Sequence, residues 1–573
     1  MNALTYSTAV YSGRVQLVTM RQRSLTVARL RVLLVAALFT ALAAAAVMRI
    51  AYLGLTDAAH SSTSFAEALL PPRGEITDRN GQPLARAFPA FALWYNPDAL
   101  GGGSALVKTP KEVARELKAI FPEIDEVEVA DRLAKGKSGY LRRRVLPEDA
   151  NRVQAIGELA LELPQETDRH YPQGSMGAHV LGYVGADGHG RVGMEAVLDK
   201  QLRDAATRAT PAPLSIDVRV QGALEDELTR GMRATNALGG AGIVLDVDTG
   251  EVLALASLPA FDPNRIDESG AQNMFNRVTN QVYELGSTFK PLTVAAGIDA
   301  GTIKDFGRRY SARPFPIGGF TIRDSHDLGA SLNTPEMLMH SSNVVTAHMV
   351  RDMGPDQLKK VMADLGMNAR PEIELPAKGF PIWASGKWPL LRGMTVGYGH
   401  GIAVTPLHLA SAYATMVNGG IYRPATMHKL EPHQVPKGRR VFKASTSARM
   451  NQLLRMIAVY GTGKKADAEG FRVGGKTGSA EKPSAGGYKK SSIVATFAAA
   501  FPMDRPRYVV IAMLDEPKGT VASSFQRTAA WNAAPVVGRL VPRIGPVLGV
   551  PPDAHRDVDL TDLAPLVPKK GGE

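Results

Sequence analysis

Cysteine is absent from the 573 residues, which excludes disulfide bonds, thiolate metal sites and cysteine nucleophiles. The 12 histidines include no H-E-x-x-H pattern. The pairs His340/His348 and His400/His408 stand eight residues apart, without acidic partners at ligand spacing. We therefore expect no metal site and no cofactor.

Acidic residues are missing from the first 49 positions, which hold six arginines. Over the whole chain, Lys plus Arg (67) exceeds Asp plus Glu (55) by 12, so half of the basic excess lies in this short segment. The bulk of the protein is therefore close to electrically balanced. We expect no nucleic-acid partner.

A run of apolar and small residues without a charged side chain covers Val32–Met48, flanked by Arg31 and Arg49. Its 17 residues span about 25 Å as a helix. Small residues at 41–46 are followed by more apolar chain without a clean cleavage site, which argues against a cleaved signal peptide. The sequence predicts a single transmembrane anchor over 32–55. The arginines before it predict that residues 1–31 are cytoplasmic and that the remainder lies across the membrane.

The rest of the chain has ordinary globular composition, with 45% hydrophobic and 21% charged residues. A polar stalk over 56–70 is expected to lead into an α+β domain, so that the stalk and domain together occupy 56–225. Helical patterns there cover 110–120 and 149–162. This region shows no obvious chemistry.

The sequence predicts a second domain over residues 226–545. Two hairpins are predicted, one from 243–247 and 251–255 and the other from 493–501 and 508–514. Helices are expected between them over 334–352, 406–418 and 445–459. Strands at both ends with helices between them predict one antiparallel sheet that closes late in the chain, flanked by helices. Residues 546–573 are expected to form a flexible tail.

A candidate nucleophile with a neighbouring base occurs in Ser287-Thr288-Phe289-Lys290, because residues i and i+3 share one face of a helix. Ser479-Ala480-Glu481-Lys482 matches the same S-x-x-K pattern. Gly286 precedes Ser287 as a helix entry, whereas Ser479 lies in a stretch rich in glycine and proline. Pro291 is expected to distort the first turn after Ser287.

An S-x-N pattern occurs in Ser341-Ser342-Asn343. It supplies a hydroxyl suited to proton relay and an amide suited to peptide binding. Ser331-Leu332-Asn333 has the same spacing. Asn333 and Thr334 directly precede Pro335, so we interpret that second match as the cap of a helix.

A K-T-G pattern follows in Lys476-Thr477-Gly478-Ser479. It supplies a cation and two hydroxyls, which are suited to binding a carboxylate. Lys137-Ser138-Gly139 is a similar match in the other domain. Gly470–Thr477 also satisfies the phosphate-loop pattern, but neither a buried strand before it nor a helix after it is expected. The three motifs occur in a fixed order: S-x-x-K comes first, S-x-N follows 54 residues later, and K-T-G follows after another 135. Chance seldom produces this joint pattern.

With these three motifs the chain resembles the class B penicillin-binding proteins. Three further segments resemble the non-catalytic motifs of that class: 73–81 (RGEITDRNG), 169–174 (RHYPQG) and 190–195 (GRVGME). The stretch 396–406 and the short N-terminal tail look most like the septal, cell-division transpeptidase of Gram-negative bacteria. The chain departs from the usual pattern at Leu285-Gly286, where Pro-Gly is commoner, and at Ser479, where threonine is frequent.

The resemblance implies a peptidoglycan D,D-transpeptidase or carboxypeptidase that acts on stem peptides ending in D-Ala-D-Ala and is acylated by β-lactams. It assigns roles to eight residues: Ser287 as nucleophile, Lys290 as base, Ser341 as proton relay, Asn343 as holder of the substrate amide, and Lys476, Thr477, Gly478 and Ser479 as the carboxylate-binding strand. The amides of Ser287 and Ser479 would form the oxyanion hole. Burial and the Lys476 cation would both lower the pKa of Lys290.

Other assignments remain open: an elongation-specific class B transpeptidase, a β-lactam hydrolase or sensor with the same motifs, and a non-catalytic scaffold of the division machinery. The resemblance also implies a single-pass protein of the cell inner membrane with a periplasmic catalytic domain. Its expected partners are the membrane, a polytopic lipid II polymerase and other division proteins.

Overall fold

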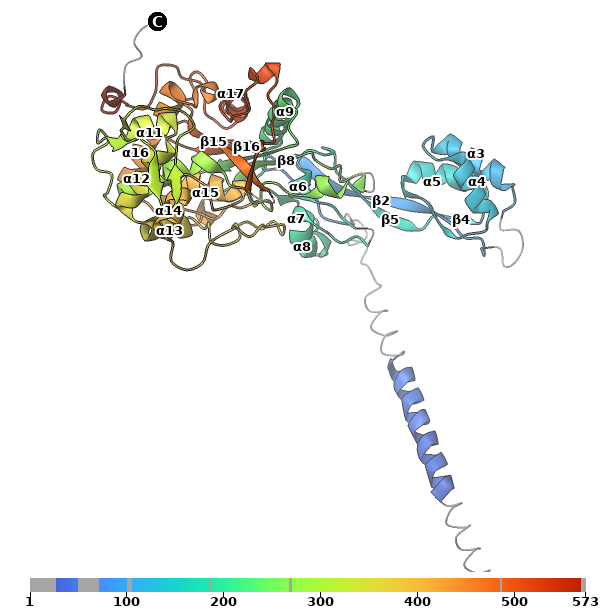
Figure 1. Ribbon diagram of the computed structural model, residues 1–573. Coiled ribbons are helices and arrows are strands. Elements are labelled where there is room, and N and C mark those ends of the chain that lie inside the picture. Colours follow the sequence, from blue (N-terminus) through green and yellow to red (C-terminus); the bar gives the residue numbers. More distant parts are fainter. Residues whose placement is uncertain are drawn as a thin grey trace, which may run out of the picture. The chain divides into compact units, whose positions relative to one another are not determined.

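The computed structural model describes residues 27–49, 72–99, 106–185, 187–266, 270–484 and 487–567. The predicted stalk over 56–70 lies outside the described residues, as do most of the N-terminal tail and the last six residues. The chain divides into two compact units, Met1–Leu70 and Pro71–Glu573 (Figure 1).

In the first unit, Val27–Arg49 forms one helix of 23 residues with a mean hydropathy of 2.3. At 1.5 Å per residue it measures about 34 Å, enough to cross the hydrocarbon core of a bilayer. Thr40 donates its hydroxyl to the carbonyl of Ala36 at 2.8 Å, so this polar group is satisfied within the helix. The helix begins five residues before the predicted span and therefore includes Arg29 and Arg31.

The second unit is built on one antiparallel sheet with strand order β15, β16, β17, β7, β8. The strands are Gly474–Ser484 (β15), Gly487–Phe501 (β16), Tyr508–Asp515 (β17), Gly239–Asp246 (β7) and Val252–Leu258 (β8). β7 pairs with β8 in the first predicted hairpin, and β16 with β17 in the second. β17 then pairs with β7, which confirms a single sheet closed by the C-terminal part of the chain.

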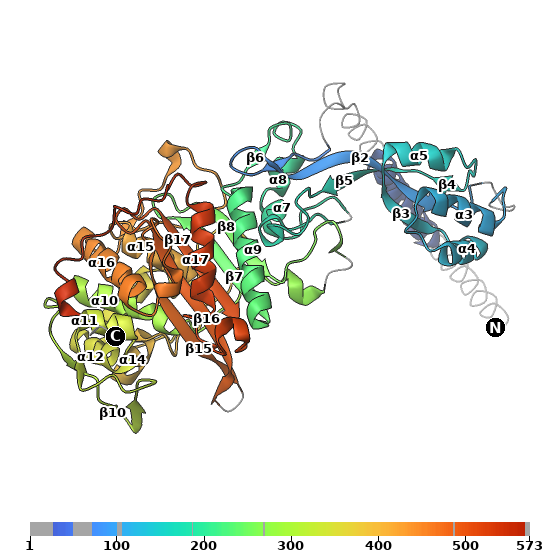
Figure 2. The same ribbon diagram turned by 90° about the horizontal axis from the view of Figure 1, so that it is seen from above.

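Both faces of this sheet are covered by helices, because its central strands are apolar on both sides (Figure 2). Helices α9 (Val218–Thr235) and α17 (Ala533–Ile544) pack on one face, against alternate residues such as Val244 and Val510. The opposite face packs against α15 (Pro406–Val417) through residues such as Ile243 and Ile511. Helices α10 (Lys290–Asp299) and α16 (Ala444–Tyr460) share this second core.

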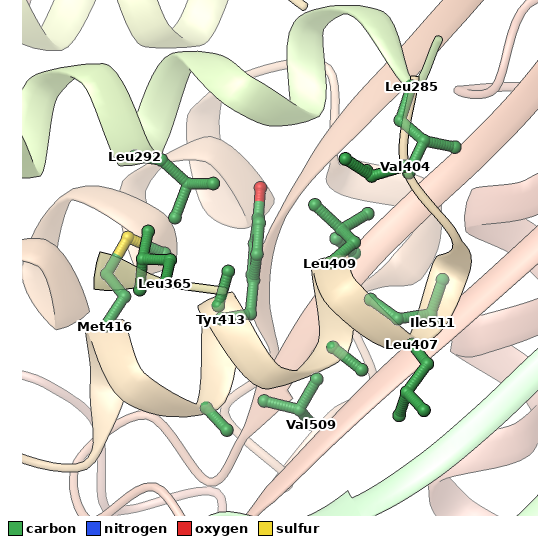
Figure 3. Close-up of a cluster of buried hydrophobic side chains, with 14 of the residues drawn as sticks. Leu285, Leu292, Leu365, Val404, Leu407, Leu409, Tyr413, Met416, Val509 and Ile511 are labelled. Atoms are coloured by element: carbon green, nitrogen blue, oxygen red, sulfur yellow. The ribbon is translucent and has the colours of Figure 1, made fainter. Parts of the chain in front are cut away.

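Tyr413 of α15 stands at the centre of that second core (Figure 3). Leu292 of α10 and Val509 of β17 belong to the same cluster. The Tyr413 hydroxyl donates to the carbonyl of Thr288 at 2.8 Å, so a core side chain holds the backbone next to Ser287. Burial raises the pKa of Tyr413 well above its usual value, and the group stays a neutral donor.

The helix predicted over 334–352 is interrupted. The structure has α11 at Thr334–His340 and α12 at Asn343–Met353, with Ser341 at the break in the left-handed region (φ 63°). Further helices are α13 (Pro355–Asp364) and α14 (Leu390–Gly397). Short two-stranded antiparallel sheets are formed by β9/β12 (Tyr310–Ser311, Ser331–Leu332), β10/β11 (Phe315–Ile317, Phe320–Ile322) and β13/β14 (Ile421–Tyr422, Arg439–Arg440). The apolar periodicity gave no sign of the break.

The N-terminal region of the second unit has its own mixed sheet. Its strands are Ile76–Thr77 (β1), Pro83–Tyr95 (β2), Gly139–Val145 (β3), Leu161–Glu162 (β4), Gln165–His170 (β5) and Ala212–Pro213 (β6). Its helices are α3 (Pro110–Ile120), α4 (Glu126–Ala134), α5 (Pro147–Gln154), α6 (Ala178–Leu181), α7 (Gly193–Val197) and α8 (Asp199–Arg203). The helix expected over 149–162 is wrong in its second half, because α5 ends at Gln154 and β4 follows.

This region contains two different cores. Helices α3, α4 and α5 pack on β2 around Leu93, Leu117 and Val153, in a cluster of their own. Nearer to the five-stranded sheet, Ile76 and Leu214 belong to the same cluster as Ile243 of β7. The base of the N-terminal region is thus packed continuously onto the sheet that follows it.

Three segments that resemble family motifs meet at this base. Arg73 and Arg169 both form ion pairs with Glu195, at 2.7 Å each, and all three side chains are almost fully buried. Tyr171 donates its hydroxyl to Glu195 at 3.3 Å. Arg73 also pairs with Asp199 at 2.7 Å. One buried carboxylate therefore joins the three motifs.

The C-terminal segment 546–573 was expected to be flexible, but its described part makes specific packing contacts. Asp557 pairs with Arg455 of α16 at 2.7 Å, and the Leu563 side chain is buried in the main core. Asn333 donates its side-chain amide to the Leu566 carbonyl at 2.6 Å. Residues 550–567 therefore pack on the region that contains the five-stranded sheet and its helices. The polar composition of this segment gave no sign of these three contacts.

Candidate active site

Ser287 lies in a tight turn at the start of α10. Gly286–Phe289 forms a 3-10 turn and Lys290 begins the α-helix, so Pro291 occupies the first turn, where its missing amide costs little. Ser287 is partly exposed, whereas Lys290 is completely buried. The sequence predicted the helix entry; the 3-10 geometry is the distortion expected near Pro291.

The K-T-G motif lies on β15, the edge strand of the sheet, which runs beside this turn. A side chain on Gly478 would meet the Leu285 carbonyl oxygen at 2.4 Å and the Thr288 side chain at 2.7 Å. Only glycine permits this approach. Gly474, Gly475 and Gly478 are residues that strands generally avoid, which is why sequence reasoning missed the strand.

Ser341 links the two lysines. Its hydroxyl oxygen lies 3.1 Å from Nζ of Lys290 and 3.0 Å from Nζ of Lys476. Lys290 also donates to the Ser341 carbonyl. The left-handed conformation of Ser341, uncommon outside glycine, turns this residue toward both amines. Residues from three distant motifs thus form one hydrogen-bonded cluster.

The electrostatics of this cluster depend on burial. Lys290 and Lys476 have no exposed surface. Burial lowers the pKa of Lys290 well below its usual value, the Lys476 cation lowers it further, and Asp324 opposes the shift. Burial lowers the pKa of Lys476 to about 7. A neutral amine, which can accept a proton, is therefore accessible near neutral pH.

The S-x-N segment is held by Asp324, a residue that sequence reasoning missed. Ser342 donates its hydroxyl to Asp324 at 2.7 Å, and the amides of Asn343 and Val344 donate to the same carboxylate. The side-chain amide of Asn343 reaches the Arg323 carbonyl at 3.4 Å. A carboxylate at the N-terminus of α12 is also favoured by the helix dipole.

The hydroxyls of β15 are positioned by residues outside the motif. Ser479 accepts a hydrogen bond from the Ala529 amide at 2.9 Å, which leaves its own proton free to donate outward. Thr477 lies 2.9 Å from the Thr462 hydroxyl, and Lys476 donates to the Thr477 hydroxyl at 3.2 Å. The contacts with Thr462 and Ala529 span 15 and 50 residues and left no local signal in the sequence.

A glycine-rich turn supports the other side of Ser287. The Gly286 amide donates to the Gly399 carbonyl at 3.2 Å. Glu284 accepts from the Gly401 amide at 2.9 Å and lies 3.2 Å from Nδ1 of His400. Gly399 has φ +85°, and a side chain on it would meet the Gly286 oxygen at 2.0 Å. The nucleophile turn is thus held between β15 and this turn.

The competing motif matches lie elsewhere or have structural roles. Asn333 caps α11 with a reciprocal hydrogen bond from Glu336, as predicted. Lys137 and Ser138 precede β3 in the N-terminal region. Gly470–Thr477 runs into β15, so no helix follows it as a phosphate loop requires. Among the described residues, His, Asp and Glu side chains form no group suited to a metal ion.

Comparisons with known proteins agree with this geometry. Residues 240–537 match the family model of the penicillin binding protein transpeptidase domain, and residues 68–207 match that of the penicillin-binding protein dimerisation domain. The first match includes all eight predicted site residues, and the second includes the buried Arg73–Glu195–Arg169 cluster.

Individual relatives cover most of the chain. A probable peptidoglycan D,D-transpeptidase FtsI of Caulobacter vibrioides is 37% identical over 87% of this chain and 85% of its own length. The peptidoglycan D,D-transpeptidase FtsI of Escherichia coli strain K12 is 30% identical over 84% of each chain. In fold, the chain is similar to penicillin binding protein 3 of Mycobacterium tuberculosis, solved in complex with aztreonam, with a TM-score of 0.66 and 24% identity over 84% of this chain and 98% of that one.

Proposed function

Because the chain belongs to the penicillin-binding proteins, we propose that its three-motif cluster catalyses D,D-transpeptidation of peptidoglycan stem peptides. The relatives named FtsI favour the septal, cell-division role over the elongation-specific one. The observation that carries the proposal is the Ser341 hydroxyl, within hydrogen-bonding distance of the buried amines of both Lys290 and Lys476.

The first half of the reaction is acylation of Ser287. Neutral Lys290 takes the hydroxyl proton as Ser287 attacks the carbonyl of the penultimate D-Ala. The backbone amides of Ser287 and Ser479 hold the developing oxyanion, with each donor worth about 3 kcal/mol. Ser341 passes a proton to the leaving amine, since it touches both lysines. The terminal D-Ala then departs.

The substrate lies along the open edge of β15. This strand pairs with β16 on one side only, so its free backbone groups can bind an extended peptide. Lys476, with the Thr477 and Ser479 hydroxyls, holds the terminal carboxylate. Asn343 holds the substrate backbone amide from the opposite wall. Gly478 provides close packing between β15 and the nucleophile turn.

The same geometry accounts for acylation by β-lactams, whose strained amide resembles the D-Ala-D-Ala bond. The acyl group then remains on Ser287. A β-lactam hydrolase needs a further base to activate the deacylating water, and the described residues around the cluster offer no assigned one. A scaffold would have no need of two buried lysines with lowered pKa values.

We further propose that Val27–Arg49 anchors the protein in the inner membrane, with the N-terminus cytoplasmic and the catalytic domain periplasmic. The domain limits proposed are 32–55 for the anchor, 56–225 for the pedestal and 226–545 for the transpeptidase. The anchor and pedestal would bind a polytopic lipid II polymerase and other division proteins. Replacing residues 1–70 with an unrelated anchor tests this, since unchanged polymerase binding and septal recruitment would contradict an essential contribution of the anchor.

The decisive experiment for the chemistry is covalent labelling with a fluorescent penicillin. We expect stable labelling of the native protein, loss of the label in Ser287→Ala, and retention in Ser479→Ala. Folded protein that takes no label would refute the catalytic assignment. Rapid loss of the label would favour the hydrolase.

A further inference from the structure

A cavity of about 570 Å³ opens beside the cluster and has no role in the acylation described above. One wall is formed by β11 and the residue after it, including Phe320, Ile322 and Arg323. The other wall comes from α14 and the following turn, including Leu391, Arg392 and Tyr398. The β10/β11 hairpin and α14 can be located in Figure 2.

Two features distinguish this cavity from ordinary surface. Phe320 is 66% exposed, an unusual exposure for a large aromatic side chain beside an active site. Arg323 and Arg392 are both exposed, and among the residues that the structure describes neither guanidinium has a hydrogen-bond or ion-pair partner. The cavity therefore combines an apolar wall with two uncommitted positive charges.

The cavity is connected to the catalytic groups through its walls. The carbonyl of Arg323 accepts the Asn343 side-chain amide at 3.4 Å. Tyr398 immediately precedes Gly399, whose carbonyl accepts the Gly286 amide next to Ser287. The cavity thus adjoins the glycine turn, whereas β15 lies against the opposite side of the nucleophile turn. A chain in the cavity would approach Ser287 past Asn343 and the glycine turn, rather than along β15.

We propose that this cavity binds the acyl acceptor, a second stem peptide that carries a free amine and free carboxylates. The proposal rests on the transpeptidase function above. Phe320, Ile322 and Leu391 contact the apolar parts of the acceptor, and Arg323 and Arg392 bind its carboxylates. The amine attacks the carbonyl carbon of the Ser287 ester, a C–N bond forms, the C–O bond to Ser287 breaks, and one amine proton returns to the serine oxygen.

The test separates transfer to a stem peptide from transfer to a small amine. The full-length protein in detergent is assayed in three ways: acylation by penicillin, exchange of the terminal D-Ala of a pentapeptide-bearing substrate for an added free D-amino acid, and formation of the cross-linked dimer from the pentapeptide-bearing substrate alone. A free D-amino acid takes the place of the leaving D-Ala on β15 and does not need the cavity.

We expect Arg323→Ala and Arg392→Ala each to lower dimer formation about fivefold, the scale of an exposed charge pair. The double variant should lose more, and Arg392→Lys should recover part of the loss. Acylation and D-amino acid exchange should stay within about twofold of the native rates. Arg313→Ala is the matched control, because Arg313 is exposed on the same hairpin region but does not line the cavity.

Two outcomes would overturn the proposal without affecting the function of the cluster. Unchanged dimer formation in the double variant would show that the cavity does not bind the acceptor. An equal fall in exchange and in dimer formation would place the donor stem there instead. Loss of penicillin acylation in the native protein would refute the proposed function itself, and is thereby distinguished from failure of the acceptor site.

Discussion

Ser342 donates its hydroxyl to the carboxylate of Asp324 at 2.7 Å, and this contact joins the S-x-N motif to the loop after β11. The same carboxylate accepts the first amides of α12. It is also the anion that opposes the lowering of the Lys290 pKa. Asp324 therefore acts on the cluster in two ways, by fixing the position of Asn343 and by its charge.

Asp324→Asn separates these two actions, because asparagine keeps an acceptor oxygen but has no charge. We expect the acylation rate to fall about tenfold, since charge-assisted hydrogen bonds contribute about 1.5–3 kcal/mol. Removing the anion also lowers the pKa of Lys290, so the acidic limb of the pH–rate profile should move to lower pH. Asp327→Asn is the control, because among the described residues the Asp327 carboxylate accepts a hydrogen bond only from the nearby Gly329 amide. A limb that moves upward would contradict this account.

Lys476→Met should move the same limb in the opposite direction. Below about pH 7 Lys476 carries its proton, and its charge disfavours protonation of Lys290. Methionine keeps the buried volume but removes that charge, so the pKa of Lys290 rises and acylation requires higher pH. The measurement is penicillin acylation from pH 5 to 9. The overall rate falls as well, but the position of the limb is the diagnostic quantity.

Gly399→Ala should abolish acylation and destabilise the catalytic region. A side chain there adds a contact of 2.0 Å with the Gly286 oxygen to the cost of a left-handed backbone. Gly354→Ala is the matched control: it has a similar φ of +88° but open space around it, so it should cost only the backbone strain, about 1–3 kcal/mol of stability. Thermal unfolding and penicillin labelling distinguish the two. Equal effects would show that the close contact is unimportant.

The sequence predicted much of this site because its chemistry is encoded in short motifs. Ser287 with Lys290, Ser341 with Asn343, and Lys476 with Thr477 were each visible as local patterns. The two hairpins were also predictable, since their strands are continuous apolar runs around clear turns. The helix cap at Asn333 followed from the proline two residues later.

What the sequence did not reveal depends on contacts between distant segments. Asp324 lies 18 residues from Ser342 in an irregular loop, and nothing local marks it among the acidic residues. Ala529 meets Ser479 through a backbone amide, which has no sequence signature. The break at Ser341 overrides an uninterrupted helical pattern, because its side chain has to reach both lysines. Tertiary contacts decide such positions.

Glu195→Gln tests the buried junction between the N-terminal region and the catalytic sheet. Glu195 has no exposed surface and pairs with Arg73 and Arg169, so neutralising it leaves two buried guanidinium groups undercompensated. Removing one partner of a buried ion pair costs about 3–5 kcal/mol. We expect a large fall in the thermal unfolding temperature, while penicillin still labels the fraction that remains folded, because the cluster around Ser341 does not contact Glu195. Glu116→Gln, which removes an exposed pair with Lys108, should change stability by less than about 1 kcal/mol. If the two variants were equally stable, the three motifs would not depend on this carboxylate for their packing.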